Sequence, residues 1–273
     1  MYENLRCKLL VTCCNEQGGL YQILFQKNTY SVTKVQYGHF TGIAKYRDQY
    51  VIANPAQVFL FDRQFQVLAA SDEIYLDIHG VAVYKDNAFV VETMKNSIGI
   101  YDLPSLKRSS EIRFHPSDID VYHINDLYVA GDRLFISMFS PLDEWLPQCG
   151  HGGVIVEYDL LENKVKKIHH DHLNQPHSVL YHDGQIFYCN SRPYEVKRGG
   201  EVIFTTASYT RGLAINAPYL FVGQSISRNM GEEATEAAKN HGMICGIYVF
   251  NYVERASEFI SLPSREVYGM VIE

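Results

Sequence analysis

The sequence has few of the features, such as tryptophan, paired cysteines or long apolar runs, that assign a protein to a structural class. It has one Trp in 273 residues, and its six Cys form no C-x-x-C pair. No run approaches the roughly 18 apolar residues that a membrane helix needs. The first 17 residues lack the apolar core, about 7–15 residues long, of a secretory signal. Free thiols in a reducing cytosol are the simplest interpretation, so we expect a cytoplasmic protein.

Basic residues are also in deficit. The chain has 24 Lys and Arg against 31 Asp and Glu, a net charge of −7, which argues against nucleic acid or an anionic membrane as a partner. It has no Walker-type phosphate loop, no G-x-G-x-x-G after a strand, no G-x-S-x-G elbow and no H-E-x-x-H. Nucleotide-driven chemistry and serine hydrolysis therefore lack support. What is abundant is Tyr and Phe, 20 and 14 residues, which favours β-structure.

A repeated unit organises the chain. Each unit is a β-rich run, a short turn such as Asp183-Gly184, and a second β-rich run, which together indicate a hairpin. Two further predicted strands follow, for example 57–62 with 65–70. Four strands in about 40–50 residues are typical of a propeller blade. The units begin near residues 41, 79, 125, 177, 211 and 268, so the sequence predicts six blades.

The two ends of the chain are predicted to share one blade. The last unit has room for a single strand, whereas the N-terminal segment holds three, over 8–13, 20–26 and 32–36. Pairing between these segments closes the ring and removes an exposed sheet edge. The predicted fold class is all-β, with residues 1–273 forming one six-bladed β-propeller domain. The Trp-Asp and Gly-His dipeptides of WD repeats are missing, which disfavours a scaffold propeller of that class.

Polar residues occupy the start of every unit, where the innermost strand of a blade meets the central channel. In blade order these anchor residues are Thr41, His79, Asn125, His177, Arg211 and Tyr268. Two positions earlier, on the same side of the strand, come His39, Asp77, His123, Gln175, Tyr209 and Glu266. The sequence therefore predicts a polar site on the propeller axis.

Two long insertions are predicted on the same face as this site. They span 140–152 and 225–243, and the second contains a helix-favouring stretch at 231–239. Long loops that gather on one face build or cover a site. The predicted substrate-binding residues are His39, Asn125, Trp145, Asn190, Ser225 and Arg228. A further cluster, His169, His170 and His172, is expected in a solvated turn between two blades.

Imidazoles that converge with carboxylates indicate a divalent metal. Three His favour zinc or iron, with copper, manganese or calcium as alternatives. The predicted metal ligands are His79, His123 and His177, and the predicted catalytic residues are Asp77, Arg211, Glu266 and Tyr268. The carboxylates would orient a ligand or act as a base, Arg211 would hold a substrate anion, and Tyr268 would exchange a proton.

Six motifs occur in a fixed order over roughly residues 75–250. They are Asp77-Ile-His-Gly-Val-Ala, His123-Ile-Asn, Pro176-His-Ser, Arg211-Gly-Leu-Ala, Phe221-Val-Gly-Gln-Ser and Cys245-Gly-Ile-Tyr-Val. In this order they resemble an uncharacterised bacterial family described as a domain of unknown function. Tyr248 replaces the family's Trp, and Asp126 stands where the family has Gly. The resemblance implies a propeller-like fold and these site positions, but no reaction.

A more distant similarity, of architecture alone, is to six-bladed propellers of the gluconolactonase and strictosidine-synthase type, which carry a metal or a catalytic group on the axis. Three functions stay open. The first is a metal-dependent hydrolase or lyase that acts on a small, anionic molecule at the channel mouth. The second is a metal-free acid–base enzyme, and the third is a ligand- or protein-binding propeller without turnover. Because propeller channels are normally polar and wet, the ring of anchor residues can also be merely solvated.

Overall fold

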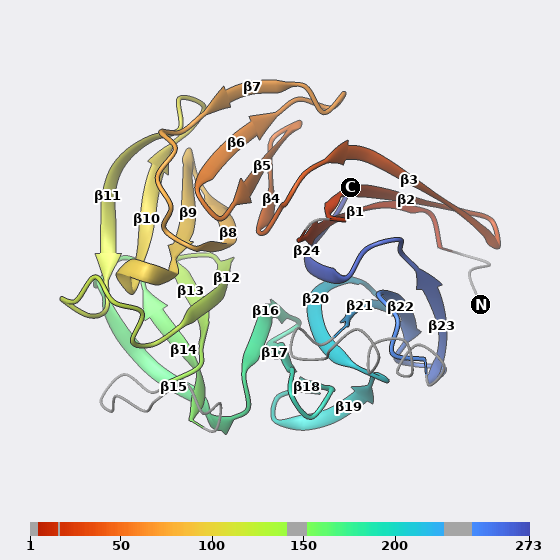
Figure 1. Cartoon of the computed structure of the whole chain (residues 1–273). Helices are drawn as coiled ribbons and strands as arrows, with labels where there is room; N and C mark the ends of the chain where they lie inside the picture. The colour runs from red at the N-terminus through yellow and green to blue at the C-terminus, as the bar shows by residue number, and fades with distance from the viewer. Residues whose placement is uncertain (1–4, 16, 141–151, 227–241) are drawn as a thin grey trace, which may run out of the picture.

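The computed structural model describes residues 5–15, 17–140, 152–226 and 242–273. In that part of the chain, 24 strands form six four-stranded sheets arranged around a central axis (Figure 1). The fold is a six-bladed β-propeller, as the repeat predicts. The described residues contain no α-helix and one 3-10 turn, η1 (Thr93–Lys95). None of their helices is long and apolar enough to cross a membrane.

We number the blades in chain order and give each blade's strands from the axis outward. Blade 1 holds β4 (Ile43–Tyr46), β5 (Gln49–Asn54), β6 (Gln57–Phe61) and β7 (Val67–Ala70). Blade 2 holds β8 (Ile78–Tyr84), β9 (Asn87–Glu92), β10 (Ser97–Asp102) and β11 (Lys107–Arg113). Blade 3 holds β12 (Ile124–Ala130), β13 (Arg133–Met138), β14 (Gly153–Asp159) and β15 (Lys164–Leu173).

The remaining blades follow the same pattern. Blade 4 holds β16 (Pro176–His182), β17 (Gln185–Asn190), β18 (Glu195–Arg198) and β19 (Glu201–Thr205). Blade 5 holds β20 (Tyr209–Asn216), β21 (Tyr219–Ser225), β22 (Gly246–Asn251) and β23 (Ala256–Ser261). Blade 6 holds β24 (Glu266–Ile272), β1 (Cys7–Cys14), β2 (Gly19–Gln26) and β3 (Thr29–Tyr37).

Blade 6 joins the two ends of the chain, as predicted. The C-terminal strand β24 pairs antiparallel with β1, so that Val271 lies opposite Leu10 and Glu266 lies opposite Cys14. Figure 1 shows the C-terminus beside β1, with β24 nearest the axis. The pairing covers the edge of β1 and gives blade 6 four strands like the other blades.

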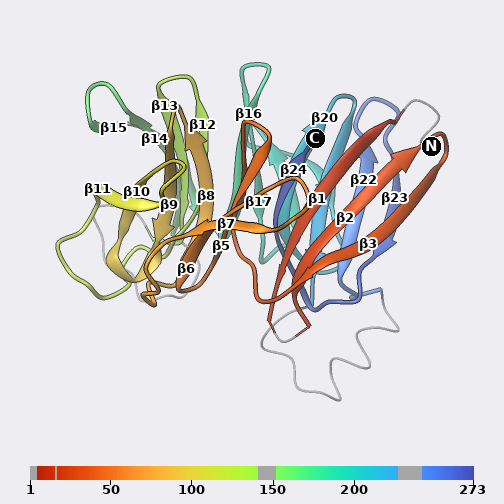
Figure 2. The same ribbon diagram turned by 90° about the horizontal axis from the view of Figure 1, so that it is seen from above.

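The first two strands of a blade are joined by tight hairpins. In blade 4 the turn residues Asp183 and Gly184 have φ angles of 48° and 77°, the left-handed conformation that two-residue hairpins require. Arg47 in blade 1 and Lys85 in blade 2 also have positive φ angles, at 56° and 55°. The side view in Figure 2 shows the strands running between the two faces of the ring.

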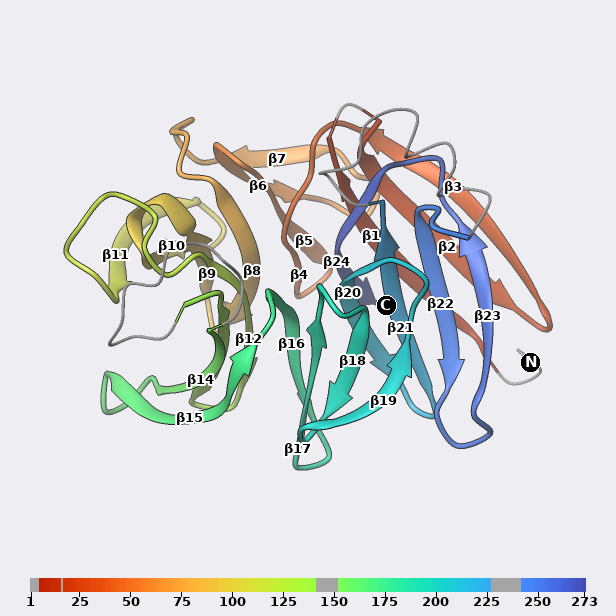
Figure 3. The same ribbon diagram turned by 60° about the horizontal axis from the view of Figure 1, so that its bottom comes forward.

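The hydrophobic core lies between neighbouring blades. Six clusters of buried apolar residues are present in the described structure, and each spans one of the six blade interfaces. Leu10 of blade 6, for instance, packs in one cluster with Ile52 of blade 1. Because apolar side chains fill these interfaces, the six innermost strands are held side by side around the axis (Figure 3).

One expectation about placement is wrong. His169, His170 and His172 lie within the outermost strand of blade 3, β15, and not in a turn between blades. The strand continues to Leu173 because Gly153 pairs with that residue at the end of β14. His169 Nε2 lies 2.5 Å from Glu157 Oε2 of β14, so this imidazole has a cross-strand carboxylate partner.

Candidate active site

Irregular pairing in the innermost strands lets anchor residues face the axis. The register between first and second strands shifts over residues 78–81 in blade 2, 177–180 in blade 4 and 210–213 in blade 5. An extra residue in one strand of a pair bends that strand and re-aims its side chains. Each of these intervals includes an anchor residue. The innermost strands of these three blades therefore turn their polar anchor side chains toward the channel.

The residue after each anchor is small in five blades. These residues are Gly42, Gly80, Ser178, Gly212 and Gly269. A Cβ atom on Gly42 would lie 2.5 Å from the carbonyl oxygen of His79 and from the nitrogen of Val81, so only glycine allows this approach. The approach permits a hydrogen bond from Gly42 N–H to the His79 carbonyl at 2.8 Å. Blade 3 is the exception, because Asp126 follows Asn125.

The ring of His79 has one nitrogen fixed by the protein. Its Nδ1 lies 2.8 Å from the main-chain oxygen of Asp77 and 3.0 Å from Thr93 Oγ1. The Thr93 hydroxyl donates its own proton to the Ile124 carbonyl at 2.7 Å. Both neighbours of Nδ1 are therefore acceptors, and Nδ1 carries the proton in neutral His79. The lone pair of this imidazole is then on Nε2.

His177 in blade 4 repeats this arrangement. Its Nδ1 lies 2.9 Å from the Gln175 carbonyl oxygen and 2.8 Å from Ser191 Oγ. Thr93 and Ser191 each follow their His by 14 residues. Burial, followed by the nearby charge of Arg211, holds the pKa of His177 well below its usual value. His177 is therefore a neutral imidazole near neutral pH, with its lone pair on Nε2.

His123 stands one step outside the anchor ring and has an ionisable partner. Its Nδ1 lies 2.6 Å from Asp120 Oδ2, and its main-chain N–H donates to Asp120 Oδ1 at 2.8 Å. The His123 and His79 rings are perpendicular, with centroids 5.4 Å apart. On the other side, Phe139 lies 4.4 Å from the His123 ring centroid and 5.1 Å from that of His177. An apolar ring therefore packs against both imidazoles.

Arg211 is the charged centre of the ring. Its Nη1 donates to Glu266 Oε1 across the boundary between blades 5 and 6, and both side chains are almost fully buried. Its Nη2 lies 3.4 Å from Asn125 Oδ1, and its guanidinium lies 4.0 Å from the centroid of the Tyr268 ring. Asn15 Nδ2 donates to the second oxygen of Glu266 at 2.6 Å. The Arg211 charge is thus matched by a carboxylate of the protein.

Thr41 Oγ1, Asn125 Nδ2 and the Tyr268 hydroxyl are buried polar atoms of the anchor ring that have no hydrogen-bond partner within the described part of the chain. All three can donate a hydrogen bond. Burial raises the pKa of Tyr268 well above its usual value, and the charge of Arg211 opposes this rise. Tyr268 is therefore a protonated phenol, and the ring as a whole can serve acceptor oxygens of a water or a ligand.

A cavity of about 630 Å³ opens beside the anchor ring on the side of blades 6, 1 and 2, and we call it the mouth pocket. His79, Asp77 and Tyr268 line it beside His39 and Thr41. The rings of His79 and Tyr268 are close, with centroids 5.5 Å apart. Its rim also includes two strongly exposed aromatic residues, which are Tyr37 and Tyr75. This volume is suited to a small molecule.

The structure places the remaining predicted site residues differently. Asn190 uses its side chain within blade 4, where it accepts from Asn174 N–H at 2.7 Å and donates to Glu195 at 2.9 Å. Ser225 Oγ accepts from Val267 N–H at 3.1 Å. Neither residue lines the mouth pocket. Trp145, Arg228 and the predicted helix at 231–239 fall outside the described residues. A role for any of these in substrate binding stays a prediction.

Sequence reasoning missed the residues that fix the imidazoles. Thr93 and Ser191 lie in the connections after β9 and β17 and have no unusual local sequence. The sequence signal that could have identified them is their equivalent position in two aligned repeats. Each lies 14 residues after an anchor His. Tyr37 and Tyr75 of the mouth pocket were also missed, since they come from a strand end and a loop outside the repeat.

The three predicted metal ligands share the chemistry of a metal site without forming a closed cluster. Each has Nδ1 beside an oxygen acceptor, the arrangement that fixes metal-binding imidazoles. Among the residues that the structure describes, however, no three His, Cys, Asp or Glu side chains are grouped so that they could hold an ion. The donor types fit zinc or iron, whereas their present spacing does not.

A six-bladed propeller with a polar, partly buried ring of side chains on its axis is the class of protein defined by this geometry. Residues 1–268 match the model of the family described as a domain of unknown function, DUF4915, and the chain belongs to this family. No curated protein matches the sequence. The family resemblance carried by the six motifs is confirmed.

Several solved structures share the fold. A chain of a nidogen/laminin complex superposes with a TM-score of 0.70 at 9% identity, covering 97% of this chain and 98% of that one. A protein of unknown function from Bacteroides caccae gives 0.67 at 10% identity, with 98% and 99% covered. A luciferin-regenerating enzyme gives 0.61 at 12% identity, with 84% and 78% covered. Similar propellers thus include an enzyme and a component of a protein complex, and at these identities the likeness concerns the fold alone.

Proposed function

We propose that this chain is an enzyme that acts on a small molecule in the mouth pocket by acid–base chemistry, as a hydrolase or a lyase. The observation that carries the proposal is the pairing of His79 with Tyr268. The first presents a lone pair on Nε2, because Nδ1 is bound to acceptors. The second is a phenol with no partner for its hydroxyl in the described structure. A proton acceptor and a proton donor thus line one pocket.

The chemistry follows from these two groups. His79 Nε2 takes a proton from a bound water or from the substrate, and Tyr268 gives a proton to the oxygen that leaves. Asp77 lines the same pocket and holds the Nδ1 proton of His79 through its main-chain oxygen, which fixes the direction of the imidazole. The Arg211 guanidinium against the Tyr268 ring stabilises negative charge that builds on the phenol oxygen during transfer.

The fold supports an enzymatic role only in general terms. The luciferin-regenerating enzyme has a similar propeller, so this architecture accommodates catalysis. An anionic substrate remains part of the proposal, with Thr41 Oγ1 and the Tyr268 hydroxyl, both from residues that line the pocket, as the donors that would receive it. The pocket lining itself contributes one carboxylate, from Asp77, and no Lys or Arg. We therefore expect neutral or weakly anionic substrates to bind better than multiply charged ones.

The test is a screen of lactones, esters and β-elimination substrates with the full-length protein, before and after treatment with a chelator. Any turnover found should survive chelation and fall by about 10²–10⁴-fold in His79→Gln and in Tyr268→Phe. Tyr50→Phe is the matched control. It removes another buried hydroxyl without a partner in the described structure, from a residue in the core of blades 1 and 6 that does not line the mouth pocket. Equal turnover in all four proteins, or no turnover in the wild type, contradicts the proposal.

A second candidate keeps the same site but places a divalent metal, zinc or iron before copper, manganese or calcium, on His79, His123 and His177. It is favoured by the shared placement of their Nδ1 atoms beside oxygen acceptors. When bound, such an ion would polarise a substrate or activate water. Elemental analysis of protein purified without an affinity tag, beside the double variant His79→Ala, His177→Ala, decides it. Near-stoichiometric metal that is lost in the variant supports the metal, and equal trace amounts in both reject it.

A further inference from the structure

A second cavity lies below the anchor ring, at the other end of the channel, and we call it the lower cavity. Its volume is about 420 Å³, and all six innermost strands contribute to its wall. The mouth pocket is lined by three anchor residues, Thr41, His79 and Tyr268, and by loop residues of blades 6, 1 and 2, whereas the lower cavity is lined mainly by residues that follow the anchors in all six blades. Tyr268 contributes to both, so this side chain borders both spaces.

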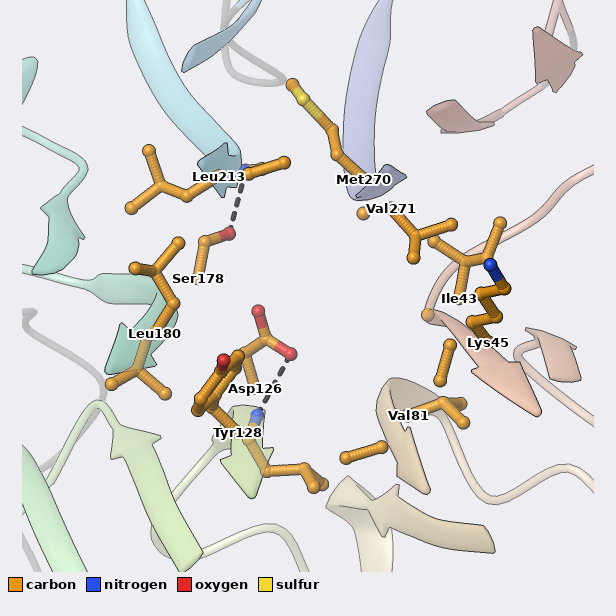
Figure 4. Close-up of a pocket in the computed structure, with 18 of the residues that line it drawn as sticks. Ile43, Lys45, Val81, Asp126, Tyr128, Ser178, Leu180, Leu213, Met270 and Val271 are labelled. Carbon is orange, nitrogen blue, oxygen red and sulfur yellow. Dashed lines mark hydrogen bonds between the residues drawn. The ribbon is translucent and has the colours of Figure 1, made fainter. Parts of the chain in front are cut away.

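Most of the residues that line the lower cavity are aliphatic, and polar atoms make up the rest of its wall. Its lining includes Ile43, Val81, Leu180, Leu213 and Met270, one from each of five blades (Figure 4). At their far ends the inner strands become less buried, as at Ile215 and Ile272. The cavity therefore offers a small ligand both apolar and polar wall surface, and it becomes more exposed toward these strand ends.

One carboxylate, that of Asp126, lies among the aliphatic residues that line the lower cavity. Asp126 is the single Asp or Glu among the residues lining the cavity, and it occupies the position that is Gly or Ser in the other five blades. Its Oδ1 accepts a hydrogen bond from Leu127 N–H at 2.9 Å. In Figure 4 the other carboxylate oxygen points into the open space between the six strands. A charged side chain at a position that favours small residues for close packing needs a reason beyond packing.

The charged and titratable groups around Asp126 are few. Arg211 is the nearest cation that affects it, and its charge is shared with Glu266. Tyr268 of blade 6 and Tyr128 of blade 3 line the cavity as phenols, and Lys45 of blade 1 is an exposed residue that also lines a surface hollow near Glu273. Blades 2, 4 and 5 contribute Val81, Ser178 and Leu213 and no charge to the lining.

We propose that the lower cavity is a second ligand site, which takes a small protonated amine with an aliphatic body and binds its ammonium group to Asp126. The site is distinct from the mouth pocket and does not depend on the acid–base function proposed there. Charge complementarity selects the amine. The Asp126 carboxylate faces a space whose described lining residues are mostly aliphatic, and the single cation among them is the exposed Lys45.

Burial raises the pKa of Asp126 to about 7, against the opposing effects of the Leu127 N–H, Arg211 and Ser178. Because the ammonium pairs with the ionised carboxylate, amine binding should strengthen as the pH rises from 6 to 8, while the amine itself stays protonated. A ligand that merely fills the apolar space would show no such dependence. The pH profile therefore separates ion pairing from simple hydrophobic burial.

The experiment uses three probes that share one ring: cyclohexylamine, cyclohexanol and cyclohexanecarboxylate. Binding to the full-length protein is measured by calorimetry and located by the methyl NMR signals of its methionines. Met270 lines the lower cavity, whereas Met138 is buried between blades 2 and 3 and serves as the internal reference. We expect the amine alone to bind with a clear affinity, to shift Met270 and to leave Met138 unchanged.

Asp126→Asn keeps the shape of the side chain and removes its charge, and it should weaken amine binding by about 10–100-fold and abolish the pH dependence. Asp72→Asn, on an exposed residue outside the cavity, is the matched control and should leave binding unchanged. His79→Gln should also leave it unchanged, because His79 lines only the mouth pocket. Equal affinity of the amine for wild type and Asp126→Asn overturns the proposal, as does amine binding without a Met270 shift or no amine binding to the folded wild type.

Discussion

Arg211 and Glu266 form an ion pair on the propeller axis, 55 residues apart in the sequence and each 3% exposed. The pair joins the innermost strand of blade 5 to that of blade 6, the blade formed by both ends of the chain. Asn15, just after β1, donates to the same carboxylate at 2.6 Å. The same ion pair therefore links the blades at the closure of the ring and places the charge at the centre of the candidate active site.

This pair makes a prediction about stability. Glu266→Gln leaves the Arg211 charge buried without its counter-ion, and we expect the free energy of unfolding to fall by about 3–5 kcal/mol. The double variant Arg211→Met, Glu266→Gln removes both charges and should recover most of the loss. Urea denaturation measures both. Arg47→Gln breaks an ion pair with Asp86 whose side chains are 69% and 65% exposed, and it should change the free energy by less than about 1 kcal/mol. Equal effects of Glu266→Gln and Arg47→Gln would contradict the prediction.

Asp126 makes a prediction about the pH dependence of stability. Its pKa rises from 3.8 to about 7 on folding, so between these values the native state holds a proton that the unfolded state has lost. Stability due to this group therefore falls as the pH rises from about 4 to 7, by at most about 1.4 kcal/mol per pH unit, and is constant above 7.

Asp126→Asn lacks this titration. Its free energy of unfolding relative to wild type should therefore increase steadily from pH 4 to pH 7 and then level off. Urea denaturation at four or five pH values checks the trend, with Asp72→Asn as a variant that should run parallel to wild type. A difference between Asp126→Asn and wild type that does not vary with pH would show that the carboxylate does not titrate in this range.

The blades, and the position of the candidate site along the propeller axis, could be predicted from the sequence because the chain is periodic. Because each unit repeats the same four strands, residues at equivalent positions such as His79 and His177 must lie at the same height on the axis. Contacts between units are a different matter. The bond between Arg211 and Glu266 depends on how two blades pack, and the cavity wall around Asp126 depends on all six. The pattern within one repeat does not specify contacts between repeats, so the sequence alone does not predict the lower cavity.

The small residues after the anchors should be sensitive to a single methyl group. Gly42→Ala would place a Cβ atom 2.5 Å from two main-chain atoms of blade 2, which cannot move aside as a flexible side chain can. We expect a loss of at least about 1–3 kcal/mol in the free energy of unfolding. Gly131→Ala is the comparison, because nothing lies within 4 Å of its Cβ position and only its φ of 62° opposes the change, at a cost of about 1 kcal/mol. Thermal unfolding of both variants measures the difference, and a smaller loss for Gly42→Ala would argue against close contact between the blades.

The two proposed versions of the active site differ in what they require of Thr93 and Ser191. Both hydroxyls lie beside the Nδ1 atom of an imidazole, but only His79 lines the mouth pocket. If His79 acts as a base, Thr93→Ala should lower kcat several-fold and change the pH profile, Thr93→Ser should restore both, and Ser191→Ala should leave turnover near the wild-type level. If His79, His123 and His177 hold a metal, both alanine variants should lose metal affinity by about 10–100-fold. Turnover and bound metal measured together on the three variants therefore separate the two versions, and unchanged values in Thr93→Ala would contradict a positioning role for this hydroxyl in either.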